Sequence, residues 1–263
     1  MNLKKLIDVL DFDKIDQDEV KHEAGRRGFF KKAGSISWKA ALATLPVALT
    51  MMPKIVKAQG SSVAEVLNFA LTLEYLEDEF YKAGLAAELI PSTDRNIFMQ
   101  ISKHETAHVN FLKNALGNSA IAKPNFDFTA DGTYMAFTDY ATFLTLSQAF
   151  EDTGVRAYKG QAGALMGDDS TLTAALQIHS VEARHASEVR RLRGNKGWIV
   201  GKEGNGVPAA IYNGEENITH GGVSLNAIAS LGDLSAGAKT EAFDEPLTRA
   251  QVEAIVTPFI VPG

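Results

Sequence analysis

A set of glutamate, histidine and tyrosine positions occurs twice in this sequence with one fixed offset. Glu74 and Glu151 are each followed, at the same distance along the chain, by a Glu-x-x-His pair. The first set comprises Glu74, Tyr81, Glu105 and His108, and the second comprises Glu151, Tyr158, Glu182 and His185. A four-helix bundle that holds two metal ions carries its ligands in such a repeated pattern. The offset therefore favours an all-α fold built from two similar halves.

Hydrophobic periodicity predicts four long helices around these positions. Apolar residues recur every three or four residues over about 62–88, 92–117, 137–166 and 170–194. We expect Ser92 or Thr93 to cap the second helix, and the turn at 167–170 to supply the cap of the fourth. Short loops within each pair predict two antiparallel hairpins, and residues 118–136 form a long crossover. This is the topology of a ferritin-like four-helix bundle.

The remainder of the chain is expected to surround this bundle. Residues 194–263 are rich in glycine and show no clear period, except for a short helix expected over Thr248–Val256 after Pro246. They are predicted to form an irregular C-terminal extension packed on the bundle, although an interaction segment is equally open. The expected organisation is an N-terminal signal segment at 1–58, the bundle at 59–193 and the extension at 194–263.

The repeated glutamates fall on the apolar stripes of the expected helices. A buried carboxylate costs several kcal/mol unless it is paired or bound to a cation, and four together repel one another. Two divalent cations would remove this repulsion, and oxygen with imidazole ligands suits iron or manganese and also accepts zinc. In a Glu-x-x-His pair, both side chains lie on one helix face and reach one ion together. The alternative is a set of solvated helix charges with incidental histidines.

The expected arrangement of ligands follows from this register. Glu105 and Glu182 are predicted to bridge the two ions. The terminal ligands are predicted to be Glu74 and His108 on one ion, and Glu151 and His185 on the other.

The N-terminal segment carries three signal features in order. Arg26, Arg27, Phe29 and Lys31 resemble the twin-arginine export consensus R-R-x-F-x-K. The apolar run Ala40–Met52 has about 13 residues, too few to span a bilayer but suited to a signal peptide. Small residues at positions 56 and 58 then predict cleavage after position 58. The resemblance implies passage through the twin-arginine export machinery to the periplasm or beyond; a basic arm with a short buried helix is the alternative.

Composition excludes sites that depend on cysteine and argues against nucleic acid as a partner. The chain has no cysteine, which excludes disulfides, thiolate metal sites and cysteine nucleophiles. Residues 1–58 carry 11 of the 26 Lys and Arg and 7 of the 32 Asp and Glu, so the rest has a net charge of −10. An acidic body argues against nucleic acid as a partner. No transmembrane helix is expected after the signal segment.

Four stretches resemble the ferritin-like domain family, and in particular its bacterial and plant desiccation-related branch. They are Asn68–Tyr81, Lys103–His108, Lys196–Trp198 and Glu241–Leu247, and the resemblance covers about residues 60–260. It implies the same ligand set of Glu74, Glu105, His108, Glu151, Glu182 and His185. The family includes iron oxidation and storage, peroxide reduction and manganese catalases, whereas the desiccation-related branch has no settled activity.

The expected function follows from these features together. We expect an exported protein with two metal ions that acts on dioxygen or peroxide in oxidative or desiccation stress. Iron is the preferred metal, and manganese is the second candidate. One alternative is a manganese catalase-like protein that disproportionates peroxide, and another is a non-enzymatic protein that protects the cell envelope during drying. A homo-oligomer is compatible with either, although a storage cage would have to accommodate the long tail.

Several further side chains have competing interpretations. Tyr81 and Tyr158 are the candidate catalytic residues, as electron donors or by orienting a ligand, or else ordinary core tyrosines. Asp78 either orients a ligand imidazole or, as we prefer, is a surface carboxylate between Glu77 and Glu79. His179 is expected to be a satisfied core histidine rather than a further ligand or proton carrier. The sequence identifies no partner for His104 or His220.

Overall fold

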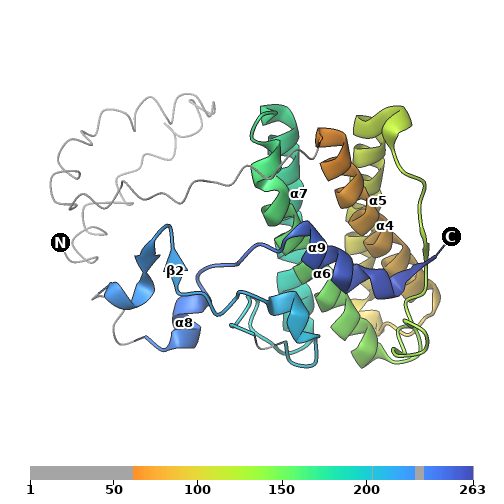
Figure 1. Ribbon diagram of the computed structural model, residues 1–263. Coiled ribbons are helices and arrows are strands. Elements are labelled where there is room, and N and C mark those ends of the chain that lie inside the picture. Colours follow the sequence, from red (N-terminus) through yellow and green to blue (C-terminus); the bar gives the residue numbers. More distant parts are fainter. Residues whose placement is uncertain (1–61, 203, 229–233, 263) are drawn as a thin grey trace, which may run out of the picture. The chain divides into compact units, whose positions relative to one another are not determined.

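The computed structural model describes residues 62–202, 204–228 and 234–262. The expected export signal at residues 1–58 therefore lies outside the described residues. Four long α-helices lie side by side in the described chain, as Figure 1 shows, and confirm the predicted bundle. They are α4 (Val63–Ala86), α5 (Ser92–Leu116), α6 (Tyr140–Gln161) and α7 (Asp169–Leu192). None of the helices in these ranges is long and apolar enough to cross a membrane.

The long helices form two hairpins. Helix α4 packs on α5 and α6 packs on α7, while a smaller contact joins α4 to α6. The 3-10 helix η4 (Ala162–Leu165) lies in the short connection between α6 and α7. Residues 117–139 form the long crossover, which begins with the 3-10 helix η3 (Gly117–Ser119). The two-hairpin topology predicted from loop lengths is present.

Local capping explains where three of the helices begin. Ser62 and Glu65 form a capping box at α4, with the Glu65 amide 3.2 Å from Ser62 Oγ. Asp139 and Asp168 accept hydrogen bonds from backbone amides three residues later and cap α6 and α7. Helix α6 is shorter than predicted at both ends, because it begins only after its cap Asp139 and because residues 162–165 tighten into the 3-10 turn.

The predicted cap of α5 is wrong. Neither Ser92 nor Thr93 is the N-cap, because Ser92 already belongs to the helix. The N-cap is Pro91, whose carbonyl accepts hydrogen bonds from the amides of Asp94 and Arg95, each at 3.0 Å. Proline has no amide to leave unsatisfied at this position, so the helix starts without a side-chain cap.

Two hydrophobic clusters fill the bundle. The larger is aromatic and centres on Phe80, whose ring stacks on Phe143 at 4.9 Å and meets Phe150 edge-on at 5.0 Å. The smaller is mainly aliphatic and includes Leu71 and Leu112. Burial of each such side chain stabilises the fold by about 1.5–3 kcal/mol.

The C-terminal part adds short elements, of which the 3-10 helix η5 (Ala209–Tyr212) and the helix α9 (Arg249–Val256) contact α6. The rest include the 3-10 helices η6 (Leu225–Ala227) and η8 (Thr257–Phe259), the helix α8 (Ala236–Thr240), and strands β2 (Thr219–His220), β3 (Val223–Ser224) and β4 (Ile260–Val261). Strand β2 pairs with β3, and β4 pairs antiparallel with β1 (Asn125–Phe126) of the crossover. The short helix expected before Val256 is α9, and Thr248 caps it with Gln251.

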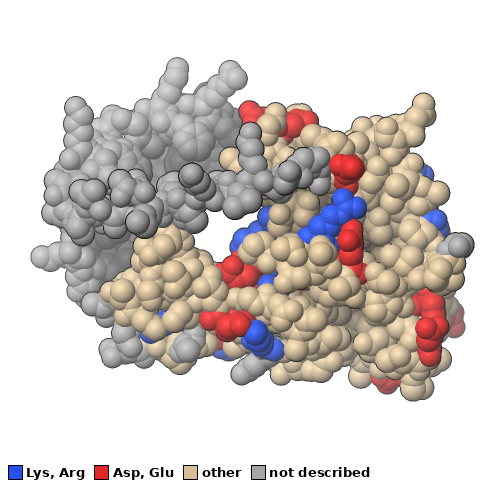
Figure 2. Space-filling model, in the orientation of Figure 1, with Lys and Arg blue, Asp and Glu red and all other residues tan. Residues whose placement is uncertain are grey.

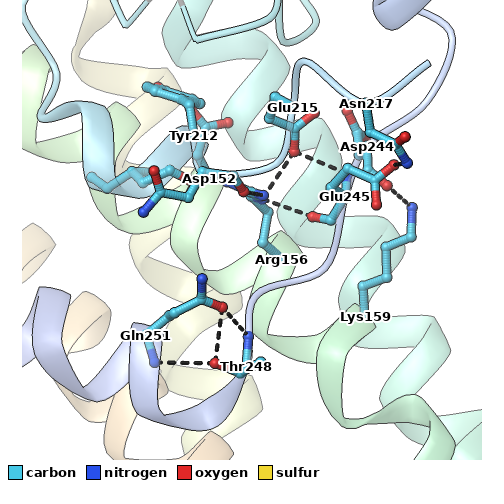
Figure 3. Close-up of polar contacts among 12 residues, drawn as sticks. Asp152, Arg156, Lys159, Tyr212, Glu215, Asn217, Asp244, Glu245, Thr248 and Gln251 are labelled. Atoms are coloured by element: carbon cyan, nitrogen blue, oxygen red, sulfur yellow. Dashed lines mark hydrogen bonds and ion pairs between the residues drawn. The ribbon is translucent and has the colours of Figure 1, made fainter. Parts of the chain in front are cut away.

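A buried arginine anchors the extension to α6 (Figure 3). The Arg156 side chain is fully buried, and its Nε lies 2.9 Å from Glu215 Oε1 and 2.7 Å from the Glu245 carbonyl oxygen. Its terminal nitrogens donate to the carbonyls of Ile211 and Asn213. One guanidinium therefore satisfies four acceptors that the extension would otherwise bury unpaired.

A second buried group lies beside this anchor. The Asp152 carboxylate accepts hydrogen bonds from Arg190 of α7 and from the Tyr212 hydroxyl, the latter at 2.7 Å. Gln148 donates to the same hydroxyl at 2.8 Å. These contacts connect both helices of the second hairpin to η5, so the extension is part of the fold around α6 and α7.

Charged side chains are dispersed on the face drawn in Figure 2. Acidic and basic residues of the described chain form small separate patches there, and most of the face is neutral. Exposed ion pairs of the described chain include Arg249 with Glu253, whose side chains are 43% and 50% exposed. Such exposed pairs add at most about 1 kcal/mol each.

Replacement of Arg156 by leucine is predicted to be strongly destabilising. Glu215 and several carbonyls would lose their donor in a buried setting, which typically costs about 3–5 kcal/mol. Urea unfolding of the full chain measures this loss directly. The exposed Arg249→Leu variant serves as the control and is expected to cost less than about 1 kcal/mol. Equal effects of the two substitutions would show that Arg156 is not the anchor.

Candidate metal centre

The six side chains predicted as metal ligands come together in the interior of the bundle. They form two groups in which the potential ligand atoms all lie within 4.8 Å of one another. One group comprises Glu74, Glu105, His108 and Glu182, and the other comprises Glu105, Glu151, Glu182 and His185. Glu105 and Glu182 belong to both groups, as expected for the bridging positions. Each of the four long helices contributes, and binding by these residues remains a prediction that the geometry fits.

The two Glu-x-x-His pairs place an imidazole beside a carboxylate on the same helix. On α5, His108 Nδ1 lies 3.0 Å from Glu105 Oε2. The same nitrogen lies 3.1 Å from Glu74 Oε2 on α4 and 3.0 Å from Glu182 Oε1 on α7. A single imidazole nitrogen thus faces carboxylates from three helices.

The second half repeats this arrangement. On α7, His185 Nδ1 lies 3.2 Å from Glu182 Oε2. It also lies 2.9 Å from Glu105 Oε1 and 3.3 Å from Glu151 Oε2. The fixed offset between the two sets in the sequence therefore becomes an approximate two-fold relation between the halves of the site.

Hydrogen bonding alone does not satisfy this cluster. Four carboxylates converge, and each is completely buried. Within the described chain, Glu105 Oε1, Glu151 Oε2 and Glu182 Oε1 have no hydrogen-bond partner, although imidazole nitrogens lie 2.9–3.3 Å away. One N–H group cannot serve three carboxylates at once, so buried oxygens are left over. Two divalent cations would use these oxygens and balance four carboxylate charges.

Burial dominates the electrostatics of three of the carboxylates. It raises the pKa values of Glu74 and Glu105, and the negative charge of Glu182 raises them further. It also raises the pKa of Glu151 to about 7, against the opposing effect of His185. A cation in the cluster would reverse these shifts.

For Glu182 and the two imidazoles, interactions with other members of the cluster outweigh the effect of burial on the pKa. Burial alone would raise the pKa of Glu182, but the neighbouring imidazoles of His108 and His185 outweigh it and lower the pKa to about 2. For His108, burial lowers the pKa, but hydrogen bonds to the carboxylates outweigh it and raise the pKa to about 12. Burial also lowers the pKa of His185, but the negative charge of Glu151 and the other neighbouring carboxylates outweigh it and raise the pKa. Without metal, protonated imidazoles therefore compensate part of the negative charge.

Each tyrosine of the repeat donates a hydrogen bond to a glutamate of the other half. Tyr81 on α4 donates its hydroxyl hydrogen bond to Glu151 on α6, at 2.5 Å. Tyr158 on α6 donates to Glu74 on α4, also at 2.5 Å. Burial raises the pKa values of both phenols well above 10, so both are neutral donors. The spacing predicted that the tyrosines lie near the glutamates. Only the fold shows that each tyrosine bonds a glutamate of the other half.

Glu77 belongs to this environment and was missed in the sequence. Its side chain is almost completely buried, and burial and the neighbouring Glu182 raise its pKa well above the ordinary value. A Cβ on Gly154 would lie 3.0 Å from Glu77 Oε1, so glycine leaves room for this carboxyl group. The available signal was its spacing, three residues after Glu74 and four before Tyr81, which places it on the inward stripe.

His104 was also missed. Its Nδ1 lies 2.8 Å from Nε2 of His185, and its ring is only partly buried. His104 precedes His108 by four residues and so shares its helix face. Its partner is on the other hairpin, and no spacing along the chain reveals that contact.

One other expectation is corrected. Asp78 is not a surface carboxylate, since it is buried and accepts hydrogen bonds from Thr106 Oγ1 and Lys82 Nζ, each at 2.6 Å. Its packing against α5 explains why a residue in a charge run is inside. His179 lies outside both groups of the centre.

The chain matches a known protein family. The model of the ferritin-like domain matches residues 62–195, slightly more than half of the chain. This range runs from the cap of α4 to just beyond α7 and contains all six residues of the centre. No curated protein matches the chain.

The metal-free protein is predicted to lose stability as pH rises. A raised pKa means that the stability contributed by protonated His108 is complete below the ordinary value of 6.5 and is lost as pH rises towards about 12. Each such imidazole lowers the free energy of unfolding by up to about 1.4 kcal/mol per pH unit above 6.5. Urea unfolding of chelator-treated protein at pH 7, 8 and 9 measures this slope. The His108→Gln/His185→Gln variant should flatten it, and an unchanged slope would contradict the assignment.

Proposed function

The chain belongs to the ferritin-like domain family, and from this premise we propose that its bundle holds two redox-active metal ions. Iron is the first candidate for the metal. The protein would act on dioxygen or peroxide and protect against oxidative or desiccation stress. The observation that carries the proposal is the pair of four-residue groups that share Glu105 and Glu182. Two ions held by common carboxylates are the arrangement that supports two-metal chemistry.

The burial of the site supports a small substrate. All four carboxylates are inaccessible to solvent, and the side chains of His185 and His108 are only 6% and 12% exposed. Dioxygen and hydrogen peroxide are small enough to reach such a site through fluctuations of the bundle, whereas larger organic substrates are not. The bound ions would supply the electrons and the Lewis acidity that these molecules need.

The protein side chains would hold and orient the ions. Glu105 and Glu182 would contact both ions, and the imidazoles would each contact one. Tyr81 and Tyr158 would fix the terminal carboxylates through their hydroxyl hydrogen bonds. We propose them as the groups nearest the ligands that can also donate an electron or a proton.

Manganese is the second candidate for the metal. Carboxylate and imidazole ligands suit both Fe(II) and Mn(II), and the same residues would serve either ion. A manganese form would disproportionate hydrogen peroxide, releasing dioxygen and water. An iron form would consume dioxygen or peroxide while Fe(II) is oxidised.

Export is proposed from the sequence. The twin-arginine motif and the apolar run at residues 1–58 support passage of the folded chain through the twin-arginine machinery to the periplasm. That route suits a protein whose metal is inserted before transport. The desiccation role is likewise proposed, on the resemblance of the sequence stretches described above.

Metal content of the full chain tests the proposal. Protein purified without chelators is expected to contain about two iron or manganese ions per chain by elemental analysis. The Glu105→Ala/Glu182→Ala variant is expected to lose both, because it removes the ligands common to the two groups. Glu188→Ala is the matched control, since Glu188 lies on the exposed side of α7.

The outcomes separate the alternatives. Iron would direct the next assay to Fe(II)-dependent oxygen consumption, and manganese to oxygen release from peroxide. The catalytic proposal would be contradicted if the wild-type chain contained no metal and took up no added Fe(II) or Mn(II), while its circular dichroism spectrum remained helical. A non-enzymatic stress protein would then remain.

A further inference from the structure

A chain of hydrogen bonds leads from the metal centre to the surface of α5. His104 Nδ1 lies 2.8 Å from Nε2 of the predicted ligand His185, and His104 Nε2 lies 2.7 Å from the side-chain amide of Gln100. Gln100 is exposed, His104 is partly buried and His185 is buried. The chain therefore spans the distance from the dry centre to solvent in two steps.

The ring geometry identifies a directed hydrogen bond. The planes of the two imidazoles differ by 12°, and their centroids are 5.1 Å apart. His104 Nδ1 and His185 Nε2 lie 2.8 Å apart, which is a hydrogen-bond distance and shorter than van der Waals contact. Packing of the two rings alone does not require so short a distance between the nitrogens.

The direction of the bond follows from the position of the metal ligands. Nδ1 of His185 faces the carboxylates, so it is the nitrogen that would bind an ion. Nε2 then carries the hydrogen and donates to Nδ1 of His104, which places the remaining hydrogen of His104 on Nε2. The Gln100 amide can rotate to present its oxygen to that hydrogen. Each group in the chain is then satisfied.

Among the described residues, the other half of the centre has no corresponding chain of hydrogen bonds. The position that corresponds to His104 in the second set is Val181, immediately before Glu182, and valine offers no side-chain acceptor. His108 also turns Nδ1 towards the carboxylates, and no side chain of the described residues bonds its Nε2. The approximate two-fold symmetry of the ligands is therefore broken at their outer nitrogens.

We propose that His104 is a positioning residue for His185, and that it makes the ion held by His185 and Glu151 the more tightly bound of the two. A ligand imidazole whose second nitrogen is hydrogen-bonded has a fixed orientation and is a better donor to metal. The ion held by His108 and Glu74 lacks that support and exchanges more readily. The inference rests on the proposed two-metal site and names a difference within it.

Mn(II) binding to the full chain tests this inference. Calorimetric titration and electron paramagnetic resonance of the wild type are expected to show two ions with unequal affinities. His104→Ala should lower the affinity for the tighter ion by about 10–100-fold. His104→Asn retains an acceptor at the same place and should restore most of the loss. Val181→Ala, at the corresponding position of the other half, should change neither affinity.

A double-variant comparison assigns the effect to His185. In a His185→Ala background, His104→Ala should have no further effect on Mn(II) affinity, because its partner is gone. In a His108→Ala background, the full loss should persist. A merely structural role of His104 would lower the affinity in both backgrounds.

Two results would overturn the inference, and they differ in what else they remove. Two Mn(II) ions in the wild type, with unchanged affinities in His104→Ala, would refute the role of His104 and leave the proposed function standing. No Mn(II) or Fe(II) in the wild type would remove the proposed function and this inference together.

Discussion

Four carboxylates meet in a bundle interior from which water is excluded, and their mutual repulsion is the constraint that organises this protein. Glu74, Glu105, Glu151 and Glu182 are completely buried, where unpaired charges cost far more than at the surface. The fold compensates them with two imidazoles and two phenolic hydroxyls, and still leaves three carboxylate oxygens without a hydrogen-bond partner in the described chain. Two divalent ions would resolve that imbalance, and the proposed metal binding would explain why the core contains these residues.

The same constraint couples the two hairpins. The bond from Tyr81 to Glu151 and the bond from Tyr158 to Glu74 connect α4 to α6, while the imidazoles face carboxylates of neighbouring helices. The extension is anchored to α6 close by, through the buried guanidinium of Arg156. Polar groups inside the molecule thus connect elements that hydrophobic packing would hold without a defined register. The symmetry is broken at His104, which contacts the predicted ligand His185, whereas Val181 occupies the corresponding position of the other half.

The bundle and the six candidate ligands could be predicted because they depend on spacing along one helix. Glu-x-x-His pairs and apolar stripes are local, and their recurrence at one fixed offset shows that two such units are related. Glu77 and His104 were missed for different reasons. Glu77 lies in a run of charged residues, and the glycine at position 154 leaves room for its buried side chain. His104 contacts a residue on a helix of the other hairpin. The cap of α5 was missed because the carbonyl of Pro91 can begin a helix without a side-chain acceptor.

Anomalous X-ray diffraction from crystals of the metal-loaded full chain tests the central claim most directly. The account predicts two peaks inside the bundle, about 3.5–4 Å apart as in other two-metal sites. One should contact Glu74 and His108, the other Glu151 and His185, and both should contact Glu105 and Glu182. An ordered bundle with no peak among these side chains, or with metal bound only at the surface, would contradict the claim that buried carboxylates in this protein exist to hold metal ions.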